Sequence, residues 1–557
     1  MSSYLLDTLD VIATDDGIAR LDDFLTKVKG ENRVVIGASR PLEFEKIEEL
    51  TMKTFELKPF SDDEIRRLFD KYKAFYNMEG VELRLPVLEV CRNPLHMRML
   101  FEVYQPNEIP EDINTQKLYD RYWEKKVAEI RIGALSHLDA GKKRKAEEVK
   151  EDLTKNIAAE MLASKQIMLS KSDIKNIEDE MREDYSKIQY AEVKNSTDVT
   201  ITQTIKELII EYDTIIDDAY HDLLDEGVLR EQADSVEFFH QSFFEYAVAR
   251  ALIEKEDKEQ LEYLFNNMTL WGNRGIIQQV ILYAKRKKKD EMAYKFLKTL
   301  SETNLYTKIL AIDLLKHIEN ILENEVEIYQ SVARDEIGMR EYLAGSLKDV
   351  IPKHPRVASG LIETLCRDEN RTVRRVVAEA LPELFEVNPE LATALIETLS
   401  RDEDWSVGWA ATGALPKLVE INPEVATALA KSLSGDRWTV RWAVAEVLPE
   451  LFEVNPELAT ALIGTLSRDE DYFVRRTAAK ALPKLVEVNP EVETGLIETL
   501  SRDKDSVVRR VATEALLKLA ELYPQRAHPM VERLKDVEYI EIQKAIAEII
   551  RRGLLRS

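Results

Sequence analysis

Three charged residues near the N-terminus stand where phosphate chemistry would need them. Asp7 ends the short apolar run SYLL, Asp10 lies just beyond it, and Arg40 follows a second apolar run, RVVIG. A carboxylate at a strand end can hold Mg²⁺ in a nucleotide-hydrolysing site, a second can orient the attacking water, and an arginine at the next strand end can sense the γ-phosphate. Asp7 and Asp10 are therefore candidate catalytic residues, with Asp7 also a candidate Mg²⁺ ligand, and Arg40 is a candidate nucleotide-binding residue. The alternative is that ordinary polar residues close two strands.

The sequence lacks the loop that would cradle the phosphates. Such a loop reads G-x-x-x-x-G-K followed by Ser or Thr, because its backbone amides surround the phosphate oxygens. The nearest candidate, residues 133–142, has the wrong spacing and no hydroxyl residue after Lys142. We expect ATP or ADP with Mg²⁺ to bind only in a complete protein, and not tightly to this chain alone. The chain then resembles the C-terminal piece of a larger protein: a truncated form, a broken gene, or one half of a split system.

Aromatic residues gather at a second place, at equivalent positions of a sequence repeat. They are Trp405, Trp409, Trp438, Trp442 and Tyr472. The flanking repeats carry Arg371 and Arg375 on one side, and Arg476, Ser506 and Arg510 on the other. Core packing does not require these rings, since other repeats have Arg or Ser there. Trp and Arg dominate interface hot spots, and an exposed aromatic patch usually marks a partner. We therefore predict a docking surface for a protein ligand; the alternative is that the indoles pack between repeats and stiffen the array.

The element that must position these rings is a pair of helices repeated along the chain. The prolines that open successive units are Pro355, Pro389, Pro423, Pro456, Pro490 and, in degenerate form, Pro524, spaced 34, 34, 33, 34 and 34 residues apart. Asn388 suits a helix N-cap and Pro389 suits the first helical position, where its missing N–H costs nothing. The turn RDED ends the first helix, and a second begins near Trp405. One such pair cannot bury a core of its own, so neighbouring pairs must stack.

Two further features recur in the second half of each unit. A proline inside the second helix should bend it at a fixed place; these prolines are Pro382, Pro416, Pro449 and Pro483. An aspartate lies in each turn and an arginine early in each second helix, namely Asp368, Asp402, Asp436, Asp469 and Asp503, and Arg374, Arg441, Arg475 and Arg509, with Gly408 interrupting the arginines. We interpret them as an Asp–Arg ladder between repeats, with a ligand-binding charge row as the alternative. The repeats resemble the HEAT family, including its lyase-like bacterial type, over about 200 residues; the resemblance specifies a fold and not a ligand.

Motifs in the first part of the chain follow the order of another family. After the two apolar runs come FELKPFSDDEIRRLF, CRNPLHMRMLFEVY, LYDRYWEKKV and GVLREQADSVEFFHQSFFEYAVARALIE. This order resembles the STAND class of signalling NTPases, close to the NACHT type. The resemblance implies that Asp7 and Asp10 are Walker B acids, Arg40 a sensor, Pro94 a residue beside the adenine, and His240 a winged-helix residue that contacts the β-phosphate of ADP. DTLDV departs from the commoner Walker B pattern, and the alternative for His240 is a residue that caps an apolar helix.

Composition limits the remaining function classes. The formal net charge of -25 argues against a general binder of nucleic acid or anionic membranes, because phosphates would be repelled. Acidic residues before the expected wing argue in the same way against DNA binding there. Two cysteines, Cys91 and Cys366, fit a reducing compartment. We find no apolar stretch long enough for a membrane span and no secretory signal at the start, and we expect a cytoplasmic protein.

We therefore predict a mainly α fold: a remnant of a parallel α/β P-loop NTPase domain, helical and winged-helix domains, and a C-terminal HEAT-type α-solenoid. The expected domains are a partial NTPase domain (1–58), a small helical domain (59–115), a winged-helix domain with a helical insertion (116–250), a helical linker domain (251–345) and about six HEAT repeats (346–557). Within the third, residues 140–200 suggest exposed helices or a mobile insertion.

The resemblance implies the C-terminal part of an ATP-dependent switch that senses a protein ligand through its repeats, with a role in prokaryotic antiviral defence. Such a switch forms a homo-oligomer when active and works with the missing N-terminal NTPase half or an effector. The family hydrolyses ATP, whereas this chain alone is expected to be inactive. The alternative function is a HEAT-repeat scaffold that binds proteins without nucleotide chemistry.

Overall fold

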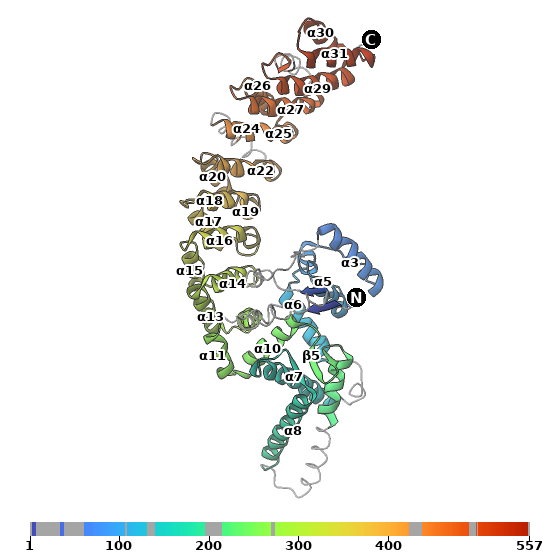
Figure 1. Cartoon of the computed structure of the whole chain (residues 1–557), viewed down its shortest axis with the longest axis vertical. Coiled ribbons are helices and arrows are strands. Elements are labelled where there is room, and N and C mark those ends of the chain that lie inside the picture. The colour runs from blue at the N-terminus through green and yellow to red at the C-terminus, as the bar shows by residue number, and fades with distance from the viewer. Residues whose placement is uncertain are drawn as a thin grey trace. The chain divides into compact units, whose positions relative to one another are not determined.

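The structure of the chain is a computed structural model that describes residues 3–6, 34–37, 61–78, 80–105, 108–130, 140–194, 214–268, 273–422, 430, 437–488, 497 and 500–554. It divides into two units, Met1–Leu300 and Ser301–Ser557, whose elements are labelled in Figure 1. Asp7, Asp10 and Arg40 lie outside the described residues, as does the helix expected between the first two apolar runs.

The two apolar runs near the N-terminus form a parallel pair of strands. β1 (Ser3–Leu6) lies beside β2 (Val34–Gly37), with Ser3 opposite Val34 and Leu6 opposite Gly37. Parallel strands need a long crossover between them, which the intervening residues provide. The parallel pairing expected from the sequence is confirmed.

Helices α3 to α6 follow, and polar side chains cap three of them. They are α3 (Asp62–Tyr76), α4 (Leu85–Cys91), α5 (Pro94–Tyr104) and α6 (Thr115–Trp123), the last continuing as a π-helical turn, Glu124–Ala128. Ser61 and Glu64 form a capping box, in which the Ser61 amide donates to the Glu64 carboxylate at 2.8 Å. Asn93 caps α5 by accepting from Leu95 N at 2.9 Å. The described part of the range 59–115, expected to be helical, is mainly helical.

The expectation of exposed helices after residue 140 is wrong for α7 (Ala140–Ala163). Its residues Val149, Leu153 and Ile157 are buried, and α7 packs against α10 (Gln241–Lys255). The helix looks polar in sequence because it is rich in charged residues. It can nevertheless be buried, because some of these charges are neutralised in buried ion pairs. Lys150 is fully buried and pairs with Asp222 of helix 214–225.

A small antiparallel sheet completes this region. β4 (Leu229–Gln232) and β5 (Ser235–Phe238) form a hairpin, and β3 (Met168–Ser170) joins the other side of β5, in the order β3-β5-β4. The hairpin expected from the apolar residues around 228–230 and 236–239 is confirmed, whereas β3 was not foreseen. Gly227, with φ of +70°, ends the preceding helix in the left-handed conformation that glycine adopts without strain.

The remaining elements described in the first unit are helices. They are α8 (Lys171–Lys194), α11 (Lys258–Asn266), α12 (Arg274–Arg286) and most of α13 (Asp290–Thr303). The basic run 285–289 lies at the C-terminal end of α12. There Lys285 contacts Asp290 at 2.8 Å and Lys289 contacts Glu256 at 2.8 Å. These pairs confirm the expected helix end and use the charges within the fold.

The second unit is an array of helix pairs. Its helices are α14 (Leu305–Leu315), α15 (Glu323–Val332), α16 (Ile337–Val350), α17 (Pro355–Leu365), α18 (Arg371–Glu379), α19 (Leu381–Val387), α20 (Pro389–Leu399), α21 (Trp405–Thr412), α22 (Leu415–Ile421), α24 (Trp438–Glu446), α25 (Leu448–Val454), α26 (Pro456–Leu466), α27 (Tyr472–Val488), α29 (Ser506–Leu522), α30 (Pro524–Leu534) and α31 (Ile540–Arg551). The second helices pack on one another in chain order, α16, α18, α21, α24, α27, α29 and α31. The caps follow the sequence, since Asn388 accepts from Leu391 N at 3.2 Å and Pro389 opens α20.

Proline divides the second helix in three of the repeats. The breaks separate α18 from α19, α21 from α22 and α24 from α25. Each new helix begins one residue before its proline, which is Pro382, Pro416 or Pro449. Proline lacks the N–H that would continue the helical ladder, so the predicted bend is confirmed here. At Pro483 the helix α27 continues unbroken from Tyr472 to Val488.

Gly408 makes a close approach between α21 and the end of α20 that only glycine allows. A Cβ at this position would lie 2.8 Å from the carbonyl oxygen of Ser400, which is backbone and cannot rotate away. We expect Gly408→Ala to lower the free energy of unfolding by about 1–3 kcal/mol, the usual cost of overpacking. The measurement is the urea midpoint of the purified chain.

The matched control is Gly464→Ala in α26, where an added Cβ meets nothing within 4 Å. Removing a helix-interior glycine should raise the free energy of unfolding by about 0.5–1 kcal/mol, and with it the urea midpoint. Equal shifts in the two variants would contradict the proposed close approach.

Candidate functional site

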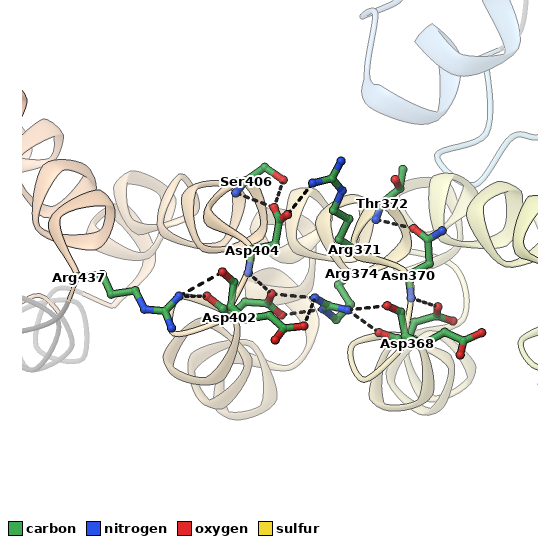
Figure 2. A network of polar contacts seen from close by, with 11 residues as sticks. Asp368, Asn370, Arg371, Thr372, Arg374, Asp402, Asp404, Ser406 and Arg437 are labelled. Carbon is green, nitrogen blue, oxygen red and sulfur yellow. Dashed lines mark hydrogen bonds and ion pairs between the residues drawn. The ribbon is translucent and has the colours of Figure 1, made fainter.

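Buried arginines join each repeat to the next. Nη1 of Arg374 donates to the carbonyl oxygens of its own turn, Asp368 O at 2.7 Å and Glu369 O at 3.1 Å. Nε and Nη2 of the same guanidinium donate to the carboxylate of Asp402, in the following turn, at 2.7 and 2.8 Å (Figure 2). One side chain thus satisfies groups of two successive turns, in the bidentate geometry that guanidinium and carboxylate share.

The same contact recurs along the array. The other pairs are Arg340–Asp368 at 2.7 Å, Arg441–Asp469 at 2.5 Å, Arg475–Asp503 at 2.6 Å and Arg509–Glu541 at 3.3 Å. Hydrogen bonds that the guanidinium donates to its partner aspartate raise the pKa of Arg374, Arg441 and Arg475. The Asp–Arg ladder inferred from the sequence is confirmed for Arg374, Arg441 and Arg475, each of which pairs with the aspartate of the following turn. Arg509 pairs with Glu541 instead, and Asp436 lies outside the described residues.

The interruption at Gly408 is compensated from the next repeat. Nη1 of Arg437 donates to Asp402 O at 3.0 Å and to Glu403 O at 3.2 Å (Figure 2). In the other repeats the equivalent carbonyl oxygens accept from the ladder arginine of their own repeat, so Arg437 replaces half of that function. The sequence alone did not reveal this substitution, because Arg437 stands outside the repeating position.

A second set of polar contacts fixes the start of α21. The Asp404 carboxylate accepts from Ser406 N at 2.9 Å and pairs with Arg371 at 3.0 Å (Figure 2). Its hydrogen bonds with Ser406 and its contact with Arg371 lower the pKa of Asp404 to about 2. Trp405 is the first residue after this cap, so the cap holds the backbone that carries the ring.

The predicted aromatic residues come together on the second helices α21, α24 and α27. We call the set Trp405, Trp409, Trp438, Trp442, Tyr472 and Phe473 the aromatic patch. The rings of Trp409 and Trp442 are nearly parallel, with centroids 6.3 Å apart and planes 12° apart. Trp438 stacks on Phe473 at 5.9 Å, and Phe473 touches Tyr472 at 4.0 Å.

The rings are not hidden between the repeats. The exposed fractions are 63% for Trp405, 44% for Trp409 and 43% for Trp438, and Tyr472 and Phe473 are exposed as well. Trp442 is half-buried, and its indole N–H donates to Thr477 Oγ1 at 2.8 Å. The alternative of interior packing therefore applies in part to Trp442 and not to the others.

Phe473 is the patch residue that sequence reasoning missed. The corresponding positions hold Thr372, Ser406, Thr439 and Val507, so the repeat comparison shows no aromatic series there. Its ring lies over Trp438 because α24 and α27 pack side by side. The signal available in the sequence was that Phe473 directly follows Tyr472.

Pro94 and His240 lie at the starts of two helices in the first unit. Pro94 opens α5 after the Asn93 cap. Nδ1 of His240 accepts from Ser242 N at 3.1 Å and so caps α10, the alternative considered for this residue. The rings of the following apolar segment, expected as core, are buried: Phe238, Phe239, Phe243, Phe244 and Tyr246.

A chain of polar contacts connects these two helix starts. His96 of α5 hydrogen-bonds to the hydroxyl of Tyr119 at 3.0 Å, and His240 hydrogen-bonds to Ser242 at 2.8 Å. Tyr119 is buried; burial raises the pKa of its phenol, and a hydrogen bond with Ser242 opposes that shift. The structure thus brings the predicted segments around Pro94 and His240 into one neighbourhood.

Two features are absent from the described residues. In those ranges no group of three or more His, Cys, Asp or Glu side chains is arranged to hold a metal ion. No described helix has the length and apolar character required to span a membrane.

Comparison with known proteins identifies the repeats. The family model of HEAT repeats matches residues 358–449 and 433–517. A search of curated proteins finds no match to this chain. The STAND resemblance and the P-loop and winged-helix assignments gain no support from these comparisons and stay hypotheses.

Several solved structures are similar in part. One is YibA of Escherichia coli, with 17% identity, 48% of this chain and 96% of that chain covered, and a TM-score of 0.27. Another is the CpcE–CpcF complex of phycocyanin lyase from Nostoc, with 21% identity, coverage of 42% and 94%, and a TM-score of 0.24. The karyopherin Kap121p, bound to the C-terminus of the phosphatase Cdc14p, has 12% identity, coverage of 80% and 49%, and a TM-score of 0.39.

The ladder generates a prediction about stability. Arg475→Ala removes a buried guanidinium and leaves the Asp503 carboxylate and two carbonyl oxygens of its own turn without those donors. We expect the free energy of unfolding to fall by about 3–5 kcal/mol, as it does when one partner of a buried ion pair is removed. Arg371→Ala is the control, because the Arg371 side chain is 72% exposed and such pairs contribute about 1 kcal/mol or less. Urea unfolding compares them, and similar losses would contradict the role assigned to the ladder.

Proposed function

We propose that the chain is a helical-repeat scaffold that binds a protein partner on the aromatic patch. The observation that carries the proposal is the exposure of five large rings from three adjacent repeats on one row of helices. Exposed rings cost free energy in water, and a contiguous set of them is uncommon on a surface that only faces solvent. Trp and Tyr also supply large contact area with few rotatable bonds, which is why they dominate interface hot spots.

The repeat architecture supports the same proposal. The buried faces of the second helices consist of small and aliphatic residues, such as Val407, Ala411 and Leu415 of the Trp-bearing repeat. The tryptophans therefore add nothing that the core needs. The ladder fixes the helices that carry them, and Thr477 holds the indole of Trp442, so the surface is largely preorganised for a ligand.

The test is a pair of exposed substitutions with a matched control. Trp405→Ser with Trp438→Ser introduces the residue found at the same position in the later repeat, Ser506. We expect this double variant to bind a partner isolated with the wild-type chain at least about 30-fold more weakly, since a hot-spot Trp contributes about 2 kcal/mol or more. Phe75→Ser removes another exposed ring, 78% exposed on α3, and should leave the affinity unchanged.

Thermal melting of all three proteins separates binding from folding. The proposal requires the double variant to keep a melting temperature close to that of the wild type. Unchanged affinity in a folded double variant would overturn it.

A second candidate function is the nucleotide-dependent switch to which the motif order points. It is supported by the parallel pairing of β1 with β2 and by the hairpin β4–β5 leading into the His240-capped α10. The polar chain from His96 to His240 joins the two segments in which Pro94 and His240 were predicted to meet a nucleotide. In this function the partner-binding repeats would sense the ligand, and a separate phosphate-binding loop would come from the missing NTPase half.

The switch hypothesis predicts weak nucleotide binding by this chain alone. No stretch of its 557 residues reads G-x-x-x-x-G-K followed by Ser or Thr, so the amides that normally hold the phosphates are lacking. Isothermal titration calorimetry of the purified chain with ATP and Mg²⁺ should give no micromolar binding. Micromolar affinity that disappears in Asp7→Ala would show that the chain holds a nucleotide by another arrangement and would contradict the division into two halves.

A further inference from the structure

The surface around the aromatic patch has an unusual distribution of charge. Apart from Phe473, the patch residues lie at two positions of the second helices, four residues apart. The first row is Arg371, Trp405, Trp438, Tyr472 and Ser506, and the second is Arg375, Trp409, Trp442, Arg476 and Arg510. Neither row contains a carboxylate, although the chain has 103 acidic and 78 basic residues. Four guanidinium groups therefore accompany the rings in an otherwise acidic protein.

The arginines at the two ends of these rows differ in their surroundings. Arg371 pairs with Asp404 and Arg375 with Glu379, so both carry a neutralising partner. Arg476 and Arg510 have no ion-pair partner within the ranges that the structure describes, and Nε of Arg476 is buried without a hydrogen-bond partner there. A guanidinium that has lost water and gained no acceptor is costly, and a carboxylate from outside would satisfy it.

Acidic residues predominate along both borders of the rows, where Arg437, Lys480 and Lys504 interrupt them. Glu369, Glu403 and Glu470 are highly exposed in the turns before the second helices. Glu446 and Glu514 are exposed one helical turn beyond the second row. A broad acidic surface would be repelled by these borders, whereas a narrow segment could lie between them.

We infer that the ligand of the aromatic patch is an extended peptide segment with apolar or aromatic side chains at one end and carboxylates at the other. The apolar end lies on Trp409 and Trp442, and the carboxylates pair with Arg476 and Arg510. This inference rests on the proposed docking function and specifies the chemical class of the partner.

The dimensions of the row set the length of the segment. The part of the second row that the segment would cover, from Trp409 to Arg510, crosses four packed helices, α21, α24, α27 and α29. Neighbouring helix axes lie about 8–10 Å apart, so the row extends over roughly 24–30 Å. An extended chain advances about 3.3 Å per residue, so about eight or nine residues cover it.

The experiment is a selection from a displayed library of random twelve-residue peptides on the purified full chain. Selected peptides are then measured by fluorescence anisotropy against the wild type, Arg476→Glu, Arg510→Glu and, as a control, Arg356→Glu, which changes an exposed arginine on α17. We expect peptides enriched in Asp and Glu next to aromatic or aliphatic residues. Each of the first two reversals should weaken binding by about tenfold or more, and the control should not. Affinity should fall as salt rises.

The outcomes separate this inference from the docking function. Peptides that depend on Trp405 and Trp438, but are basic or neutral and insensitive to both reversals, overturn the acidic class and leave docking intact. Peptides unaffected by the tryptophan variants, or no selected peptide at all, contradict both proposals. Arg510 is exposed, so Arg510→Glu keeps the test valid if Arg476→Glu unfolds, which thermal melting shows.

Discussion

The repeats depend on a buried guanidinium that hydrogen-bonds two successive turns at once. Arg374 and Arg475 each donate to two carbonyl oxygens of their own turn and to both oxygens of the next aspartate. Burying a charge in this way is favourable only when every donor has an acceptor in good geometry. The contact therefore tolerates little sliding between neighbouring pairs, and it fixes the register that apolar packing of Val and Ala alone would leave loose.

That register places single residues of different repeats next to one another and so creates a continuous surface. Rings from different repeats meet only if equivalent positions of neighbouring second helices lie side by side, as Trp409 and Trp442 do at 6.3 Å. The repeat that begins the patch is also the one in which Gly408 replaces the ladder arginine. Its missing side chain permits the close approach to Ser400, and Arg437 supplies part of the lost hydrogen bonding from the next repeat. Candidate site and altered connection thus occupy the same place in the array.

The sequence predicted the parts of this fold that local rules decide, and missed those that tertiary contacts decide. Repeat period, the Asn388 cap and the ladder followed from spacing and side-chain chemistry. The burial of α7 was missed because Lys150 counts as polar in sequence while Asp222 neutralises it in the core. Phe473 was missed because its repeat position is otherwise filled by Thr, Ser and Val.

The charge distribution follows from the same use of arginine. The chain is strongly acidic, and the second helices place Arg374, Arg441, Arg475 and Arg509 inside the ladder, where their charges are neutralised. Cations that remain at the surface beside the rings are few, and Arg476 and Arg510 stand out among them because no carboxylate within the described ranges meets them. Long-range repulsion by the whole protein and short-range attraction at these two groups act against each other. Long-range repulsion dominates for a large anionic surface, whereas a short segment with a few carboxylates can gain from the attraction at the two arginines. The acidic border therefore favours small ligands and disfavours broad ones.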